Sequence, residues 1–167
     1  STEAQFAIYK LFYRAMFNTA NRILNNKEEA EDAMQECFLK AFNCLNDLQN
    51  NQMFAGWLKQ LVIRHCLTVV KVQKKWQTET LDEKFQTITE VAHLDLEFEN
   101  EILRKKILQA MLTLKSNYRI ALSLHFIEGY DLEEIAEILQ INYGNCRTLL
   151  SRAKSSLKQK LEVYETI

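Results

Sequence analysis

The feature that most limits the fold of this chain is its near lack of residues that break helices. Its 167 residues include no proline and only three glycines, Gly56, Gly129 and Gly144. Long helices tolerate neither residue well, because glycine costs backbone entropy and proline removes a hydrogen-bond donor. The sequence therefore predicts an all-α protein.

Apolar residues recur at helical spacing and divide the chain into two parts. Residues 1–75 and 97–167 are each expected to form a small helical bundle. Residues 76–96 have weak periodicity and many acids, so we expect a flexible acidic linker there. In the first helix, Leu11 and Met16 are expected on the same buried side. Helices are expected at residues 6–24, 27–45, 54–75, 97–114 and 117–128, followed by the pair described next.

Two short helical patterns lie between residues 131 and 161. Asp131 and Glu134 match a capping box at the start of the first. Gly144 is expected to take the positive φ that reorients the chain in the turn. The second helix is expected to begin near Asn145 and to be basic on one side. This is the layout of a helix-turn-helix that reads the DNA major groove.

An ordinary helical hairpin with a solvated charged face would show the same periodicity. Reading duplex DNA requires Arg, amide and hydroxyl side chains near the start of the second helix, aimed at base edges and phosphates. The candidate duplex-binding residues on this helix are Asn145, Arg147, Thr148, Ser151, Arg152 and Lys154.

Charge is unevenly distributed although the net charge is only −1. Residues 48–78 contain five Lys or Arg and no acid, and residues 138–161 contain five as well, again with no acid. Residues 79–101 contain eight acids and one Lys, a net charge of 1 − 8 = −7. Two cationic segments indicate that the chain binds phosphates at two places, rather than chance clustering on solvated faces.

The helix expected over residues 27–45 carries a second stripe beside its apolar one. This stripe mixes carboxylates and amides with a leucine, as a docking face for a basic partner helix would. A solvated helix face is the plainer interpretation from spacing alone. Its members, at i, i+3, i+4, i+7 and i+11, are Asp32, Gln35, Glu36, Leu39 and Asn43.

Two motifs resemble those of bacterial sigma factors of the extracytoplasmic-function group. The first is AEDAMQECFLKAF, from Ala30 to Phe42, followed by FAGWL from Phe54 to Leu58. The second consists of EGY at 128–130, EEIAEIL at 133–139, Gly144 and SRA at 151–153. Both occur in the family's order and at its separation, so the resemblance covers nearly the whole chain.

The resemblance implies a sigma-2 domain at 1–75 and a sigma-4 domain at 97–167. In this family the sigma-2 helix docks on a coiled coil of core RNA polymerase, which would give Asp32, Gln35, Glu36 and Leu39 a partner. The next loop and helix capture the melted −10 element, and the sigma-4 recognition helix reads the −35 element as duplex. The linker threads through the polymerase channels. Many members are held inactive by an anti-sigma factor.

Capture of a melted strand needs a cationic surface along the backbone and groups that hydrogen-bond an unstacked base. Amides in the loop at 50–52 suit the base, and basic residues in the following helix suit the phosphates. The candidate −10 residues are Asn50, Asn51, Gln52, Lys59, Arg64, Lys71, Lys74 and Lys75.

The chain also departs from the family pattern. Asn145-Cys146 replaces the usual Thr-Val, and Leu149 replaces a frequent Arg. Ile63-Arg64-His65 replaces Ala-Arg-Asn in the −10 helix, and a Pro common before the Tyr118 region is absent. These differences bear on the −35 contacts and the promoter sequence.

No membrane span, signal peptide or C-x-x-C pair is present in the sequence. We therefore expect a cytoplasmic protein with reduced cysteines and no membrane insertion. His65, His93 and His125 share no ligand spacing, so no metal, cofactor or enzymatic activity is expected. A helix-turn-helix regulator that is not a sigma factor, and a helical protein-binding adaptor, are the alternative functions.

Overall fold

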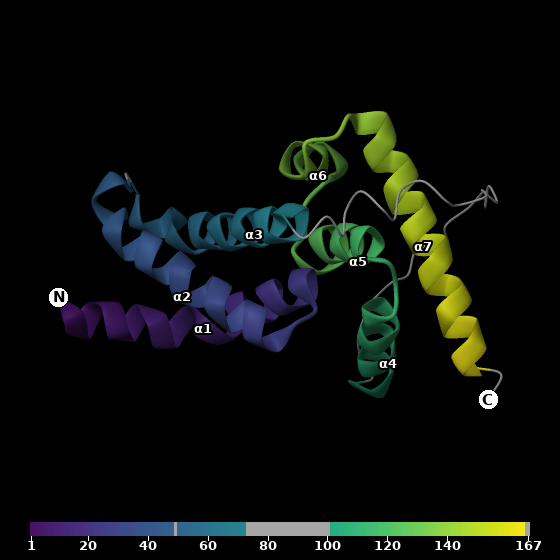
Figure 1. Ribbon diagram of the computed structural model, residues 1–167, viewed down its shortest axis with the longest axis horizontal. Coiled ribbons are helices and arrows are strands. Elements are labelled where there is room, and N and C mark those ends of the chain that lie inside the picture. The colour runs from purple at the N-terminus through teal and green to yellow at the C-terminus, as the bar shows by residue number, and fades with distance from the viewer. Residues whose placement is uncertain (49, 73–100, 166–167) are drawn as a thin grey trace. The chain divides into compact units, whose positions relative to one another are not determined.

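The computed structural model describes residues 1–48, 50–72 and 101–165. These residues form seven α-helices, three short helical turns and no strand (Figure 1). The chain divides into two compact units, Ser1–Lys74 and Lys75–Ile167. The prediction of an all-α fold with two helical bundles is confirmed. The predicted linker at 76–96 lies outside the described residues.

Three mutually packed helices make the first unit: α1 (Thr2–Leu24), α2 (Lys27–Asn43) and α3 (Phe54–Val72). Two successive asparagines separate the first two helices. Asn25 ends α1 with a left-handed φ of 49°, and the Asn26 side chain accepts a hydrogen bond from the Glu29 backbone N–H at 3.0 Å. Asparagine suits both roles because it tolerates positive φ and its short amide reaches the first helical turn.

The core of the first unit is apolar and contains two of the cysteines. Burial raises the pKa of the Cys37 thiol to about 11 and also raises that of Cys66, so both stay protonated. Its fully buried side chains include Ile23, Met34, Cys37, Leu58, Val62, Ile63 and Cys66. Rings pack at its edge, with Tyr9 edge-on to Phe38 at a centroid distance of 4.9 Å.

Leu11 is 74% exposed, so the prediction that it shares the buried side of its helix with Met16 is wrong. The two residues are five positions apart, which separates them by about 140° around a helix. The bundle covers the side of α1 that carries Met16 and Ala20 and leaves Leu11 outside it.

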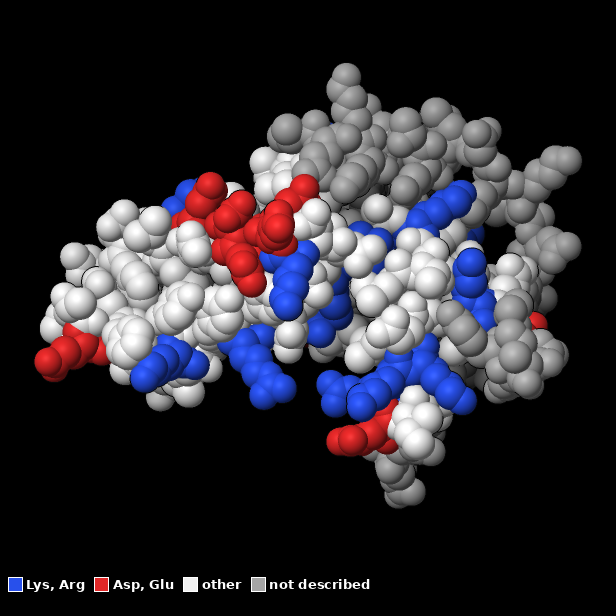
Figure 2. Space-filling model, turned by 60° about the horizontal axis from the view of Figure 1, so that its bottom comes forward, with Lys and Arg blue, Asp and Glu red and all other residues white. Residues whose placement is uncertain are grey.

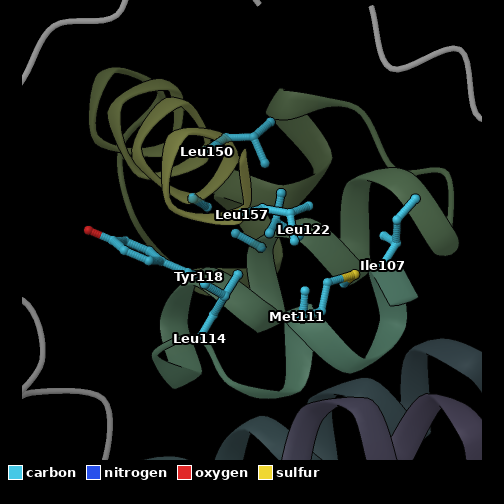
Figure 3. Close-up of a cluster of buried hydrophobic side chains, with 10 residues drawn as sticks. Ile107, Met111, Leu114, Tyr118, Leu122, Leu150 and Leu157 are labelled. Carbon is cyan, nitrogen blue, oxygen red and sulfur yellow. The ribbon is translucent and has the colours of Figure 1, made fainter. Parts of the chain in front are cut away.

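The second unit contains α4 (Glu101–Leu112), α5 (Ser116–Leu122), α6 (Leu132–Leu139) and α7 (Tyr143–Glu165). The helix predicted at 117–128 is two elements, because α5 changes at Ser123 into the π-helical turn η3 (Ser123–Ile127). The other three α-helices of this unit all pack on α7. Figure 3 shows one buried cluster, made by Ile107 and Met111 of α4, Leu114 of the turn that follows, Tyr118 and Leu122 of α5, and Leu150 and Leu157 of α7.

The helix-turn-helix is formed by α6 and α7, and its capping box is confirmed. The Asp131 carboxylate accepts from the Glu134 N–H at 2.8 Å, and the Glu134 side chain accepts from the Asp131 N–H at 3.2 Å. The expectation for Gly144 is wrong, since the positive φ of the turn, 57°, belongs to Gln140 at the end of α6. Asn142 then caps α7 by accepting from the Asn145 N–H at 2.7 Å.

With Asn142 as the cap, α7 begins two residues earlier than predicted, and Gly144 lies within its first turn. None of the helices in the described ranges is long and apolar enough to cross a bilayer.

Candidate nucleic-acid and protein interfaces

The α7 helix has one buried side and one exposed side. Cys146, Leu150, Ala153 and Leu157 are buried against the rest of the unit. At 100° per residue Thr148 and Ser151 point away from this buried side and Arg147 points about 90° from it, and all three are exposed. A guanidinium and two hydroxyls therefore face solvent within the first turns of this helix. That is where a helix-turn-helix meets base edges.

Contacts with α6 and within the first turns fix the position of this exposed side. The Cys146 thiol donates to the Leu132 carbonyl oxygen at 3.5 Å, and burial raises its pKa, which keeps the donor proton in place. The Thr148 hydroxyl donates to the Gly144 carbonyl at 3.1 Å. The Thr148 oxygen then presents its lone pairs to an outside donor.

The remaining candidates on α7 lie to either side of these three around the helix. Arg152 is half-buried, and its direction differs from that of Arg147 by about 140°. The Lys154 ammonium lies 5.3 Å from the centroid of the Phe126 ring, which holds this side chain against the unit. Asn145 is exposed, and its backbone N–H is used by the Asn142 cap. Arg147, Thr148 and Ser151 thus share one exposed arc of α7, with Lys154 next to Arg147 and with Asn145 and Arg152 next to Thr148.

In the first unit, the loop before α3 is exposed and locally ordered by one of its amides. The Asn50 side-chain oxygen accepts from the Gln52 N–H at 2.9 Å, which caps the short turn η2 (Asn51–Met53). Asn51 and Gln52 are exposed, and the neighbouring Met53 is 66% exposed. The loop therefore presents amide groups beside an apolar side chain.

Only part of the predicted basic surface of α3 lies on one side of the helix. Arg64 and Lys71 are seven residues apart, which places them within about 20° of each other, and both are exposed. The exposed Thr68 lies between them and donates to the Arg64 carbonyl at 3.0 Å. Lys59 is half-buried and about 140° away from Arg64. The candidates Lys74 and Lys75 lie outside the described residues.

The predicted stripe of α2 is exposed along its whole length. Asp32, Gln35 and Glu36 face solvent, and Leu39 is 65% exposed although it is apolar. Figure 2 shows the acidic side chains of this unit gathered mainly in one patch. With five acids and two lysines, α2 has a net charge of 2 − 5 = −3. An acidic surface with one protruding leucine suits a basic partner that also offers an apolar contact.

One contact at this stripe was missed by sequence reasoning. The His65 Nε2 atom of α3 lies 3.4 Å from the Glu36 Oε2 atom of α2. The pair connects the stripe to the helix that carries Arg64, and no local spacing signals it, because the residues belong to different helices. The His125 Nδ1 atom lies 2.8 Å from the Tyr130 carbonyl oxygen. His93 lies outside the described residues.

Comparisons with known families match both units. The model of sigma-70 region 2 matches residues 8–75, and the model of sigma-70 region 4 matches residues 104–157. The ECF RNA polymerase sigma factor SigW of Bacillus subtilis is 28% identical, over 92% of this chain and 87% of that protein. The ECF sigma factor SigE of Mycolicibacterium smegmatis is 26% identical over 90% of this chain, which spans only 59% of that relative.

A solved structure has the same fold. The sigma factor RpoE of Bartonella quintana, crystallised with the anti-sigma factor NepR, aligns with a TM-score of 0.59 and 19% identity. The alignment covers 94% of this chain and 96% of the RpoE chain.

Proposed function

Because the chain belongs to the extracytoplasmic-function group of the sigma-70 family, we propose that it binds core RNA polymerase and directs it to promoters. One observation carries this proposal: a capped helix-turn-helix exposes Arg147, Thr148 and Ser151 on one side of α7 and buries the other side. Positioning a polymerase requires binding and no catalysis by the chain itself. The two matched regions then have separate tasks.

The first domain, residues 1–75, docks on the polymerase through α2. Asp32, Gln35 and Glu36 supply charge and hydrogen bonds to a basic helix, and Leu39 inserts an apolar side chain among them. Support comes from the exposure of all four residues and the net charge of −3 on α2. Charge complementarity guides the encounter, and the leucine supplies area that is buried only in the complex.

The same domain captures the −10 element once it is melted. Asn51 and Gln52 hydrogen-bond an extruded base, while Arg64 and Lys71 follow the phosphates along one side of α3. The side-chain oxygen of Asn50 caps the turn and orders the loop, and its side-chain NH2 group contacts DNA. Lys74 and Lys75 extend the cationic surface, and Lys59, about 140° from Arg64 around α3, contacts the DNA separately. Stabilisation of the open strand is what separates initiation from simple DNA binding.

The second domain, residues 97–167, reads the −35 element as duplex through α7. Arg147 contacts base edges, and Thr148 and Ser151 contact bases or phosphates beside it. Arg152, Lys154 and Asn145, to either side of these three, contact the phosphate backbones and hold the helix in register. Residues 76–96 link the two domains and follow the polymerase channels.

Promoter recognition takes place in the compartment that holds both RNA polymerase and chromosomal DNA, so we propose that the protein is cytoplasmic. The exposed α2 stripe and the basic side of α7 are also surfaces that an anti-sigma factor would have to cover to block both tasks. We therefore also propose that an anti-sigma factor binds this chain and inhibits it.

The rival functions are a helix-turn-helix regulator that is not a sigma factor, and a protein-binding adaptor. Neither requires a region 2 with a polymerase-docking helix, whereas residues 8–75 match that region. Co-purification with core polymerase distinguishes them. A sigma factor forms a one-to-one holoenzyme that survives gel filtration, and a regulator or adaptor elutes separately from core.

A further inference from the structure

The first residue of α7 is an aromatic that the hydrophobic core does not use. Tyr143 is 48% exposed, while the aromatic residues Tyr118 and Phe126 of the same unit pack in or against the cluster beneath α7. A single exposed ring needs no explanation by itself. The position of Tyr143 is informative, because the first turn of a recognition helix is the part that enters the major groove.

Tyr143 lies beside the residue assigned to base reading. It precedes Arg147 by four positions, so the two side chains point within about 40° of each other and lie about 6 Å apart along the axis. Successive base pairs of duplex DNA are spaced by about 3.4 Å. A residue displaced by 6 Å therefore meets a base one or two pairs away from the base that Arg147 reads.

The neighbouring glycine leaves this end of the helix open. Gly144 has no positive φ, and a Cβ atom built there would meet only the Asn142 side-chain oxygen, at an ordinary distance of 3.5 Å. Neither backbone geometry nor packing within the described unit requires glycine at this position. The missing side chain keeps open the surface next to the Tyr143 ring, so a partner can approach it closely.

From these observations we propose that Tyr143 is a further specificity-determining residue for the −35 element, whose ring packs against the methyl group of a thymine. An aromatic ring suits this role, since the thymine methyl is the apolar group in the major groove. This inference rests on the proposed reading of the −35 element by α7. It adds a thymine preference one or two base pairs from the position that Arg147 specifies.

Replacing thymine by deoxyuridine, which lacks only that methyl group, gives the most direct test. The holoenzyme of the full chain is bound to a selected promoter in which each −35 thymine is replaced in turn. For the unaltered chain, one replacement at the expected spacing should weaken binding about fourfold, the factor expected for one buried methyl group. Tyr143→Ala should lose affinity for the thymine promoter and show no further loss with deoxyuridine.

Tyr143→Phe separates the ring from its hydroxyl and should behave as the unaltered chain does. Three results overturn the proposal: no −35 methyl matters to the unaltered chain, Tyr143→Ala keeps the fourfold sensitivity, or Tyr143→Phe loses as much as Tyr143→Ala. The last result would assign the hydroxyl to a phosphate or a base edge instead.

Arg147→Ala, measured in parallel, distinguishes failure of the Tyr143 proposal from failure of the proposed reading of the −35 element by α7. If its −35 preference changes while the Tyr143 variants behave as the unaltered chain, α7 reads the −35 element without Tyr143. If neither residue affects −35 preference, the reading by α7 itself fails, and this inference fails with it.

Discussion

Substitution of Arg147 by alanine should relax the sequence preference of the protein without destabilising it. The side chain is exposed in the first turns of α7, so its removal should change the free energy of unfolding by no more than about 0.5 kcal/mol. A bidentate arginine–base contact contributes about 1–3 kcal/mol of discrimination, which corresponds to about 5- to 150-fold in affinity. The loss should be confined to promoters with the preferred base at one or two −35 positions.

Two other basic residues of α7 serve as comparisons. Lys158→Ala removes the same charge from nearly the same side of the helix, about 16 Å farther along its axis, and should leave the preference unchanged. Arg152→Ala, about 140° from Arg147 around the helix, should weaken all promoters about equally. It should also lower the dependence of binding on salt by about one phosphate contact.

A promoter-library selection with holoenzyme containing each variant measures the preference, and binding titrations from low to high salt measure the phosphate contacts. Circular dichroism melting confirms that each variant is folded. An unchanged −35 preference for Arg147→Ala, or a position-specific change for Arg152→Ala, would refute the assignment of base reading to the first and backbone contact to the second.

Three further predictions concern docking, packing and pH. The double variant Asp32→Ala, Gln35→Ala should bind core polymerase at least tenfold more weakly with unchanged helicity, because each lost contact costs about 1–3 kcal/mol; equal affinity by gel-filtration titration would leave the stripe without a docking role. Leu122→Ala should lower the unfolding free energy of the second unit by about 2–5 kcal/mol in urea titration, because this fully buried side chain lies in the α4–α5–α7 cluster; a loss below about 1 kcal/mol would show that the cluster is loosely packed. The folded-state pKa of Cys37 is raised to about 11 from an ordinary 9.0, so the thiol loses its proton more readily in the unfolded chain than in the folded one. The contribution of Cys37 to the free energy of unfolding is therefore complete below pH 9 and is lost as the pH rises toward 11. Cys37→Ala should flatten this part of the stability profile, and an identical profile would contradict the prediction.

Local signals in the sequence predicted local structure well. The capping box of Asp131 and Glu134 depends on residues three positions apart, and it forms as expected. Gly144 misled the prediction because Gln140 and Asn142 provide the reversal and the cap without it. Glycine permits a positive φ, but the hydrogen bonds of the neighbouring residues decide where the chain turns.

Features that depend on packing between helices could not be predicted from spacing. Periodicity placed Leu11 with the apolar residues of α1, yet only the neighbouring helices determine which part of a helix surface is covered. The contact between His65 and Glu36 joins residues 29 positions apart, and Lys154 is held by Phe126 of another element. The exposure of Arg147, Thr148 and Ser151 was predictable from the spacing of the apolar residues of α7, but the half-burial of Arg152 and Lys154 was not.

The central claim is that this chain is a sigma factor. Mapping the start sites of transcription in vitro, with purified core polymerase and a genomic DNA library, tests it most directly. Core polymerase supplemented with this chain should initiate at a limited set of sites that share −35 and −10 elements, and core alone should not. If adding the chain produces no new starts while it still binds duplex DNA, it is a helix-turn-helix regulator and not a sigma factor.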